Sequence, residues 1–254
     1  MKKYTSSIGL FARSTLWRVL IVLVISAVLQ LLMWGLEFRS SMRAYNEARL
    51  DMPTVEKLVD RGAVNAIFRL TLTAITVILC LPGASRRSHT EYTLGRLSVS
   101  ERGIFFCQAA YNAAVYLLLF AVQTALLFAM VLVYRNLAPA ERVAPNIAYI
   151  AFYRNRFMHS ILPLEDVRLW IRNIALVLIL ALSTAEFPYL RRRGRMSATP
   201  IAVLGCVWVF FSSEIGSIGQ LVAAISGLLV VCGVVACSLT LDKRREDEER
   251  EADV

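Results

Sequence analysis

Apolar residues in this chain arrive in long blocks separated by polar segments, and they do not alternate with polar residues. Several blocks reach about 20 residues, the helical length that crosses a hydrocarbon core of roughly 30 Å. We therefore predict an all-α polytopic membrane bundle, a single integral membrane domain covering residues 1–254. About six transmembrane helices are expected, at 17–36, 63–84, 104–134, 169–189, 199–213 and 218–241.

Amphipathic segments beside the spans predict further helices. Ile8, Phe11 and Thr15 recur at helical spacing among basic residues, which is typical of a short interfacial helix before the first span; a disordered basic tail is the alternative. In the longest polar segment, 135–168, an apolar stripe predicts an amphipathic helix that lies on the outer surface or caps the bundle: Ile147, Ala151, Met158 and Leu162. The charged tail, 242–254, is expected to be helical at first and then frayed.

The charge pattern orients these spans. The chain is 57% hydrophobic with a mean hydropathy of +0.57, and its net charge is +9. Because the basic residues flank apolar blocks, they indicate cytoplasmic loops and lipid headgroups, and no nucleic-acid partner is expected. Segments 1–18, 85–103, 190–198 and 242–254 hold sixteen Lys and Arg, whereas the longer segments 37–62 and 135–172 hold eleven. We expect a multi-pass protein of the cell membrane with both termini in the cytoplasm.

Few strongly polar residues lie inside the predicted spans. Arg69 is near the outer end of the second span, where its side chain can reach the interface or can face a pathway or a partner helix. Gln108 and Asn112 share one face of the third span, which also contains Gln123. We expect these amides to bond a neighbouring helix, with a substrate contact as the alternative.

Motifs for catalysis are missing from the sequence. It contains no GxxxxGK[ST], HExxH or GxSxG pattern, and no span carries a central pair of acids. Its five cysteines lie inside apolar blocks without CxxC spacing, as expected of small buried hydrophobes. We expect no enzyme activity, no cofactor and no metal site in this chain; an intramembrane enzyme of another type is a minor alternative.

The most distinctive polar segment, 85–103, separates the second and third spans. Within it and just after it, residues 89–108 read HTEYTLGRLSVSERGIFFCQ. This pattern resembles the segment between the second and third spans of type-2 ATP-binding-cassette (ABC) permeases, where an acidic residue precedes a short Thr/Leu helix, a leucine turn and a charged residue. Ser98 departs from the family pattern, which has proline there. The resemblance implies a docking surface at Glu91, Tyr92, Thr93, Leu94, Arg96, Leu97, Val99, Ser100 and Glu101.

The resemblance implies a function that the sequence can accommodate. A permease without ATPase motifs needs a cytoplasmic element that receives motion from an ATP-hydrolysing partner. We predict the transmembrane permease subunit of an ABC transporter, an exporter, whose partners are an ABC ATPase subunit, a second permease subunit and the lipid bilayer. A non-transporting membrane scaffold or regulatory subunit is the alternative, and in the simplest reading 85–103 is an ordinary basic loop.

Overall fold

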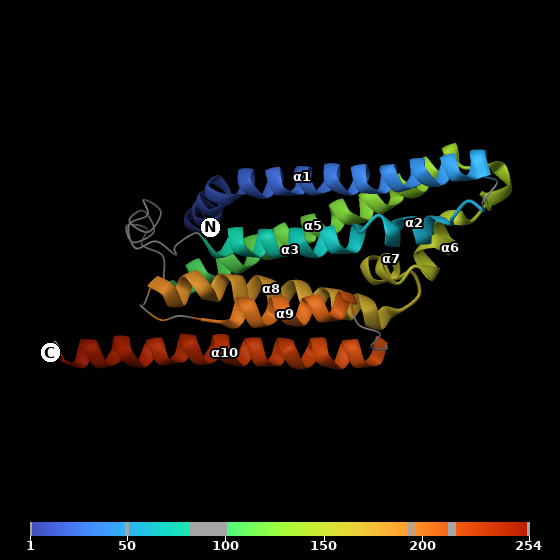
Figure 1. Ribbon diagram of the computed structural model, residues 1–254. Helices are drawn as coiled ribbons and strands as arrows, with labels where there is room; N and C mark the ends of the chain where they lie inside the picture. Colours follow the sequence, from blue (N-terminus) through green and yellow to red (C-terminus); the bar gives the residue numbers. More distant parts are fainter. Residues whose placement is uncertain are drawn as a thin grey trace.

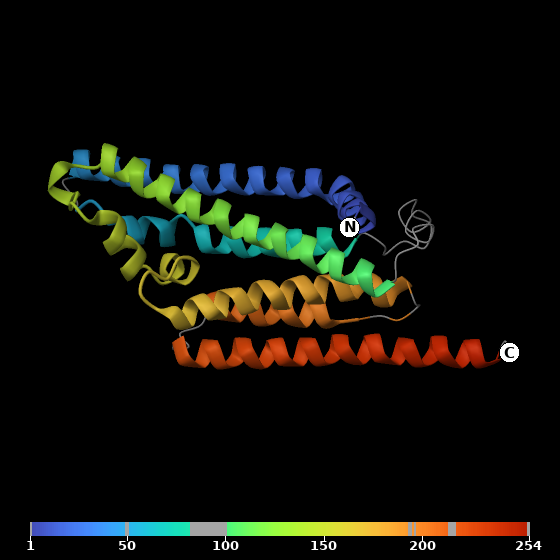
Figure 2. The same ribbon diagram turned by 180° about the vertical axis from the view of Figure 1, so that it is seen from behind.

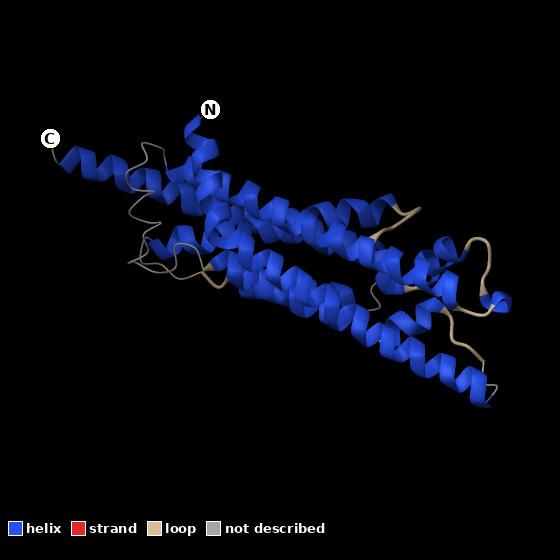
Figure 3. Cartoon of the chain, turned by 90° about the horizontal axis from the view of Figure 1, so that it is seen from above, coloured by secondary structure: helices blue, strands red, loops and turns tan. Residues whose placement is uncertain are grey.

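The structure is a computed structural model that describes residues 2–48, 51–81, 101–192, 195, 197–212 and 217–252. Within these residues every assigned element is helical and none is a strand, as the sequence predicts. The long helices run side by side along one axis (Figure 3). They are α1 (Lys2–Ala48), α5 (Glu101–Leu137), α8 (Val167–Arg192) and α10 (Ser217–Ala252).

The expected count of six transmembrane spans is not supported. Four helices are long and apolar enough to cross a membrane, and a fifth span results only if α2 (Val55–Arg61) and α3 (Val64–Cys80) are counted together. α9 (Thr199–Ser212) has 14 residues. At 1.5 Å per residue this is about 21 Å, short of a hydrocarbon core of roughly 30 Å. The fifth predicted span is therefore a shorter apolar helix packed within the bundle.

The second predicted span, 63–84, corresponds to α3, which begins directly after a bend from α2. α2 and α3 meet at an angle of 51°, where Ala63 has a left-handed backbone with φ of 52°. Gly62 precedes it, and a Cβ atom there would lie 3.0 Å from the Leu58 carbonyl oxygen and 3.1 Å from Trp34 Cα. The glycine thus permits close packing of the bend against α1.

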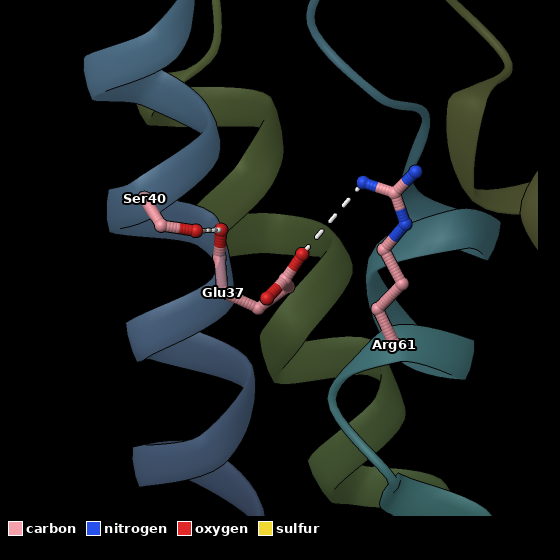
Figure 4. A network of polar contacts seen from close by, with 3 residues as sticks. All are labelled: Glu37, Ser40 and Arg61. Atoms are coloured by element: carbon pink, nitrogen blue, oxygen red, sulfur yellow. Dashed lines mark hydrogen bonds and ion pairs between the residues drawn. The ribbon is translucent and has the colours of Figure 1, made fainter.

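An ion pair joins α2 to α1. Arg61 at the end of α2 points toward Glu37 of α1, with 3.7 Å between the guanidinium nitrogen and the carboxylate oxygen (Figure 4). Ser40 donates to the Glu37 backbone carbonyl at 2.9 Å in the same view. Because the Arg61 side chain is 60% exposed, we assign this pair little stabilising energy.

The separate interfacial helix expected before the first span is absent. α1 is a continuous helix from Lys2, although its first turns bend away from the line of the rest (Figure 3). Phe11 is buried, and the Thr15 hydroxyl hydrogen-bonds the Tyr111 hydroxyl of α5 at 2.8 Å. These contacts pack residues 11–15 against the bundle, so the predicted segment is the first part of α1 and not a separate helix.

The outer amphipathic helix is also divided. α6 (Ile147–Arg154) and α7 (Arg156–Ile161) are separated by Asn155, and a 3-10 turn, η1 (Ala140–Arg142), precedes them. The Asn155 side chain accepts from the Met158 backbone N–H at 2.9 Å, which caps α7, and donates to Asp60 Oδ1 of α2 at 2.9 Å. The predicted apolar stripe is largely buried, but the polar cap splits it into two helices.

α8 is the central helix of the packed core. It contacts α3, α5, α9 and α10, whereas α1 packs on α3 and α5 (Figures 1 and 2). α10 lies at the edge of the bundle and packs mainly on α8. Its helix continues to Ala252, so the expected fraying after the first part of the tail is not seen.

The helix ends are sorted between the two ends of the bundle. Both chain termini lie at one end, together with the last turn of α3 and the first turn of α5 (Figure 1). α2, α6 and α7 lie at the opposite end. We call these the terminal end and the capped end.

Candidate functional site: polar side chains between the helices

The predicted docking residues fall mostly outside the described part of the chain. Glu91, Tyr92, Thr93, Leu94, Arg96, Leu97, Val99 and Ser100 lie in the gap 82–100, and Glu101 is the first residue of α5. The docking surface therefore stays a prediction from the sequence.

Gln123 of α5 belongs to a hydrogen-bonded layer in the middle of the bundle. It and Gln30 of α1 exchange two side-chain amide bonds of 2.9 and 2.8 Å. Gln30 also donates to Ser26 at 3.1 Å, and Thr71 of α3 donates to Ser26 at 2.6 Å. All four side chains are buried, so one polar layer joins α1, α3 and α5.

A second layer lies nearer the terminal end. Asn112 of α5 donates to the Thr184 hydroxyl of α8 at 2.9 Å. One turn along α5, Tyr116 shares a 2.8 Å bond with Thr76 of α3. The interhelical bond expected for Asn112 is present, and it ties α5 to the central helix.

Gln108 lies one turn before Asn112 and behaves differently. Its side chain is 1% exposed, as is that of Gln123, but its amide oxygen has no hydrogen-bond partner among the described residues. Within this part of the chain the expected bond from the Gln108 oxygen to a neighbouring helix is absent. A buried amide oxygen without a partner costs free energy.

Arg69 faces a neighbouring helix. Its guanidinium carbon lies 5.2 Å from the centre of the Trp208 ring of α9, and the indole N–H donates to Thr73 at 3.0 Å. A cation over an indole face is attracted by the ring quadrupole. Of the two predicted roles, the partner-helix contact is the one observed.

The capped end contains a buried arginine to which the sequence reasoning gave no role. Arg172 of α8 is 1% exposed and donates to the Ser160 carbonyl at 2.7 Å, the Ser160 hydroxyl at 2.8 Å and Asn173 Oδ1 at 2.7 Å. It also donates to Gln220 Oε1 of α10. The fork of donors on a guanidinium suits several oxygens at once, so one side chain connects α7, α8 and α10. Its place in an otherwise apolar block was the available signal.

Glu186 is the buried carboxyl on the terminal side of α8. It is 1% exposed, and within the segments that the structure describes neither carboxyl oxygen accepts a hydrogen bond. Thr199 of α9 and Ser238 of α10 are polar neighbours. Their hydroxyls are engaged elsewhere, since Ser238 donates to the Val234 carbonyl at 2.9 Å and Thr199 pairs with Ser197 at 2.7 Å. An intramembrane carboxyl in this state is a candidate functional group.

Tyrosine 149 marks the exposed surface of the capped end. Its hydroxyl donates to Glu165, and its ring stacks on Tyr153 with 6.1 Å between ring centres. The hydrogen bond to the Glu165 carboxylate favours the protonated phenol and raises the pKa of Tyr149 above 10.0.

The described segments contain no group of three or more His, Cys, Asp or Glu side chains placed to hold a metal ion. The five cysteines are free thiols, and Cys206, Cys232 and Cys237 are exposed on the isolated chain.

Together the described helices define a multi-pass helical membrane protein whose interior carries hydrogen-bonded polar layers. Comparison of the chain with models of protein families, with curated proteins and with solved structures finds no match. The arrangement can hold helices in a defined register, because each layer satisfies polar groups that hydrocarbon cannot solvate.

Proposed function

We propose that this chain is the transmembrane permease subunit of an ABC transporter, an exporter that receives motion from a separate ATPase subunit through residues 85–103. The observation that carries the proposal is the pattern in residues 89–108, which resembles the corresponding segment of type-2 ABC permeases. The proposal also includes a second permease subunit, identical or different.

The position of the flanking helices supports this role. α3 ends and α5 begins at the terminal end, where both chain termini also lie (Figure 1). The segments that follow or precede the helices at this end are rich in Lys and Arg, and the positive-inside rule favours a cytoplasmic location for them. A partner bound to 85–103 would therefore meet the same side of the membrane as the termini.

The core packing supports a route for motion. α5 begins at Glu101, within the last residues of the proposed docking segment, and bonds α1 through Gln123 and α8 through Asn112. A displacement of α5 would therefore act on both α1 and α8. Discrete side-chain bonds of this kind favour two alternative packings over continuous deformation.

The test is co-purification of an ABC ATPase subunit with the tagged full chain in mild detergent. Replacing Tyr92, Leu94 and Leu97 with Asp should abolish the association. The matched control replaces Tyr149, Tyr153 and Leu164 with Asp; these are exposed side chains of the same kinds from the capped-end segment. Equal recovery of the ATPase with both triple variants would contradict docking at 85–103, and absence of any ATPase would contradict the transporter assignment.

A scaffold or regulatory subunit is a second candidate, favoured by one observation. Most buried polar side chains in the described bundle bond one another, so few remain to contact a polar substrate. ATP turnover by the reconstituted complex separates the two candidates. A transporter should show turnover that changes with a transported compound, whereas a scaffold should show none that responds across lipids, peptides and drugs.

A further inference from the structure

A cavity of about 350 Å³ lies between α3, α8 and α9. Its walls include Val77 of α3 and Leu81, the residue after α3. Phe187 of α8 and Ile201 and Leu204 of α9 form the other sides. Val77, Leu81 and Ile201 are exposed on the isolated chain, so the cavity opens to the outside of the bundle, where lipid would be. Pro200 and Arg191 also line it, which puts it toward the terminal end.

The lining defines what the cavity can bind. Thr76 is the lining hydroxyl, and it is already bonded to the Leu72 carbonyl at 2.9 Å and to Tyr116 at 2.8 Å. Arg191 is the charged residue among those that line the cavity, and because the lining surface is almost wholly apolar it contributes its aliphatic stem there. An apolar cavity of this kind is a poor site for water. The suitable ligand is an apolar chain that carries an anionic group at one end.

From this combination we propose that the cavity binds one acyl chain of an anionic phospholipid, with the lipid phosphate at Arg191. Three features favour a lipid over a protein helix. The volume is at the small end of ligand pockets, enough for part of one chain and not for a row of side chains. Basic residues continue along the sequence at 191–195, and such clusters beside a membrane span attract anionic headgroups. The N-terminus of α9, which adds partial positive charge, lies at the same place.

This site does not depend on ATP-driven transport. A scaffold protein would bind the lipid equally well, so the failure of either proposal leaves the other standing.

The test uses the full chain in bilayer vesicles of phosphatidylcholine that contain a phosphatidylglycerol probe with a diazirine on one acyl chain. After irradiation, adducts are mapped by peptide mass spectrometry. Adducts on residues 200–204 report the cavity. Adducts on Leu229 and Val230, which are 68% and 65% exposed on α10, report ordinary lipid contact in the same sample.

Three test variants and one control variant make the result specific. Arg191→Gln should lower the cavity adducts about tenfold, as expected for the loss of a charge-assisted contact, and should leave the α10 adducts unchanged. Leu204→Trp should fill the cavity and give the same selective loss. Ile201→Trp, at a side chain that is 74% exposed, should block the opening without disturbing the core if Leu204→Trp fails to fold. Arg154→Gln, an exposed arginine of α6 at the other end, is the matched control and should change neither signal.

Several outcomes would overturn the proposal. One is a constant ratio of cavity to α10 adducts in all variants. Another is equal labelling by a phosphatidylcholine probe with the same acyl chain, because Arg191 would then not select the headgroup. A third is competition by inorganic phosphate alone at millimolar concentration, which would show an anion site without an acyl chain. Cys80 of α3 also lines the cavity. Disulfide-trapped dimers through Cys80 that exclude the probe would identify a second copy of this chain as the occupant.

Discussion

Gln108 and Gln123 provide a matched comparison on one helix. Both are glutamines of α5 with 1% exposed side chains, but Gln123 exchanges two bonds with Gln30 whereas the Gln108 oxygen has no partner. Gln123→Leu removes both interhelical bonds and leaves the Gln30 amide with its 3.1 Å bond to Ser26. Hydrogen bonds between membrane helices average about 0.6 kcal/mol and reach about 1.7, and the stranded amide adds a desolvation cost.

We therefore expect Gln123→Leu to lower the free energy of unfolding by about 2 kcal/mol. Gln108→Leu should leave it unchanged or raise it by up to about 1 kcal/mol, because it removes an unsatisfied oxygen. The double variant Gln30→Leu/Gln123→Leu removes both partners. Its loss of unfolding free energy should be smaller than the sum of the two single losses, by a coupling energy of about 1–2 kcal/mol.

The assay is reversible unfolding of the purified chain in mixed micelles by increasing SDS, followed by far-ultraviolet circular dichroism and checked by refolding. Equal losses for Gln108→Leu and Gln123→Leu would refute the reasoning, since burial alone would then set the cost. Additive losses in the Gln30 and Gln123 pair would refute it as well, because they would show that the two amides do not depend on each other.

Three further substitutions test other parts of the bundle in the same unfolding assay. Arg172→Gln should cost about 3 kcal/mol, because it breaks a buried network that includes Ser160; a loss under about 1 kcal/mol would contradict the network's role. Glu186→Gln should raise the free energy of unfolding by about 1 kcal/mol, because a buried carboxyl with neither oxygen bonded is costly. A lower free energy of unfolding would contradict this, since it would show that the carboxyl has a partner in the folded protein. Gly62→Ala should cost about 1–3 kcal/mol through its 3.0 Å contact, whereas Gly35→Ala, with no atom within 4 Å, should cost nothing; equal effects would contradict the close approach.

The long helices could be predicted from the sequence because hydrophobic length is a local property. α5 and α8 lie within a few residues of the expected spans 104–134 and 169–189. The breaks could not be predicted in the same way. Ala63 has no preference for a left-handed backbone, and Asn155 interrupts an apolar stripe because its side chain meets Asp60 from a distant segment.

The polar side chains between the helices were also predictable only in part. The interior amides stand out in apolar blocks, so Asn112 and Gln123 were candidates for interhelical bonds. Their partners were not predictable, since Gln30 and Gln123 are 93 residues apart and periodicity gives only the face that each residue occupies. Arg172 was visible near a helix end, but its role depends on α7 and α10 packing around it.

The edge position of α10 has a consequence for biosynthesis. Among the described helices α10 is made after the others, and its main contact is with α8, which is already made. At about 5–20 residues per second, the 48 residues from Asn173 to Gln220 take roughly 2–10 s to synthesise. During that time Arg172 has Ser160 and Asn173 available but not Gln220. When α10 packs on α8, Gln220 completes the set of acceptors around the Arg172 guanidinium, and this bond holds α10 against the helices made before it.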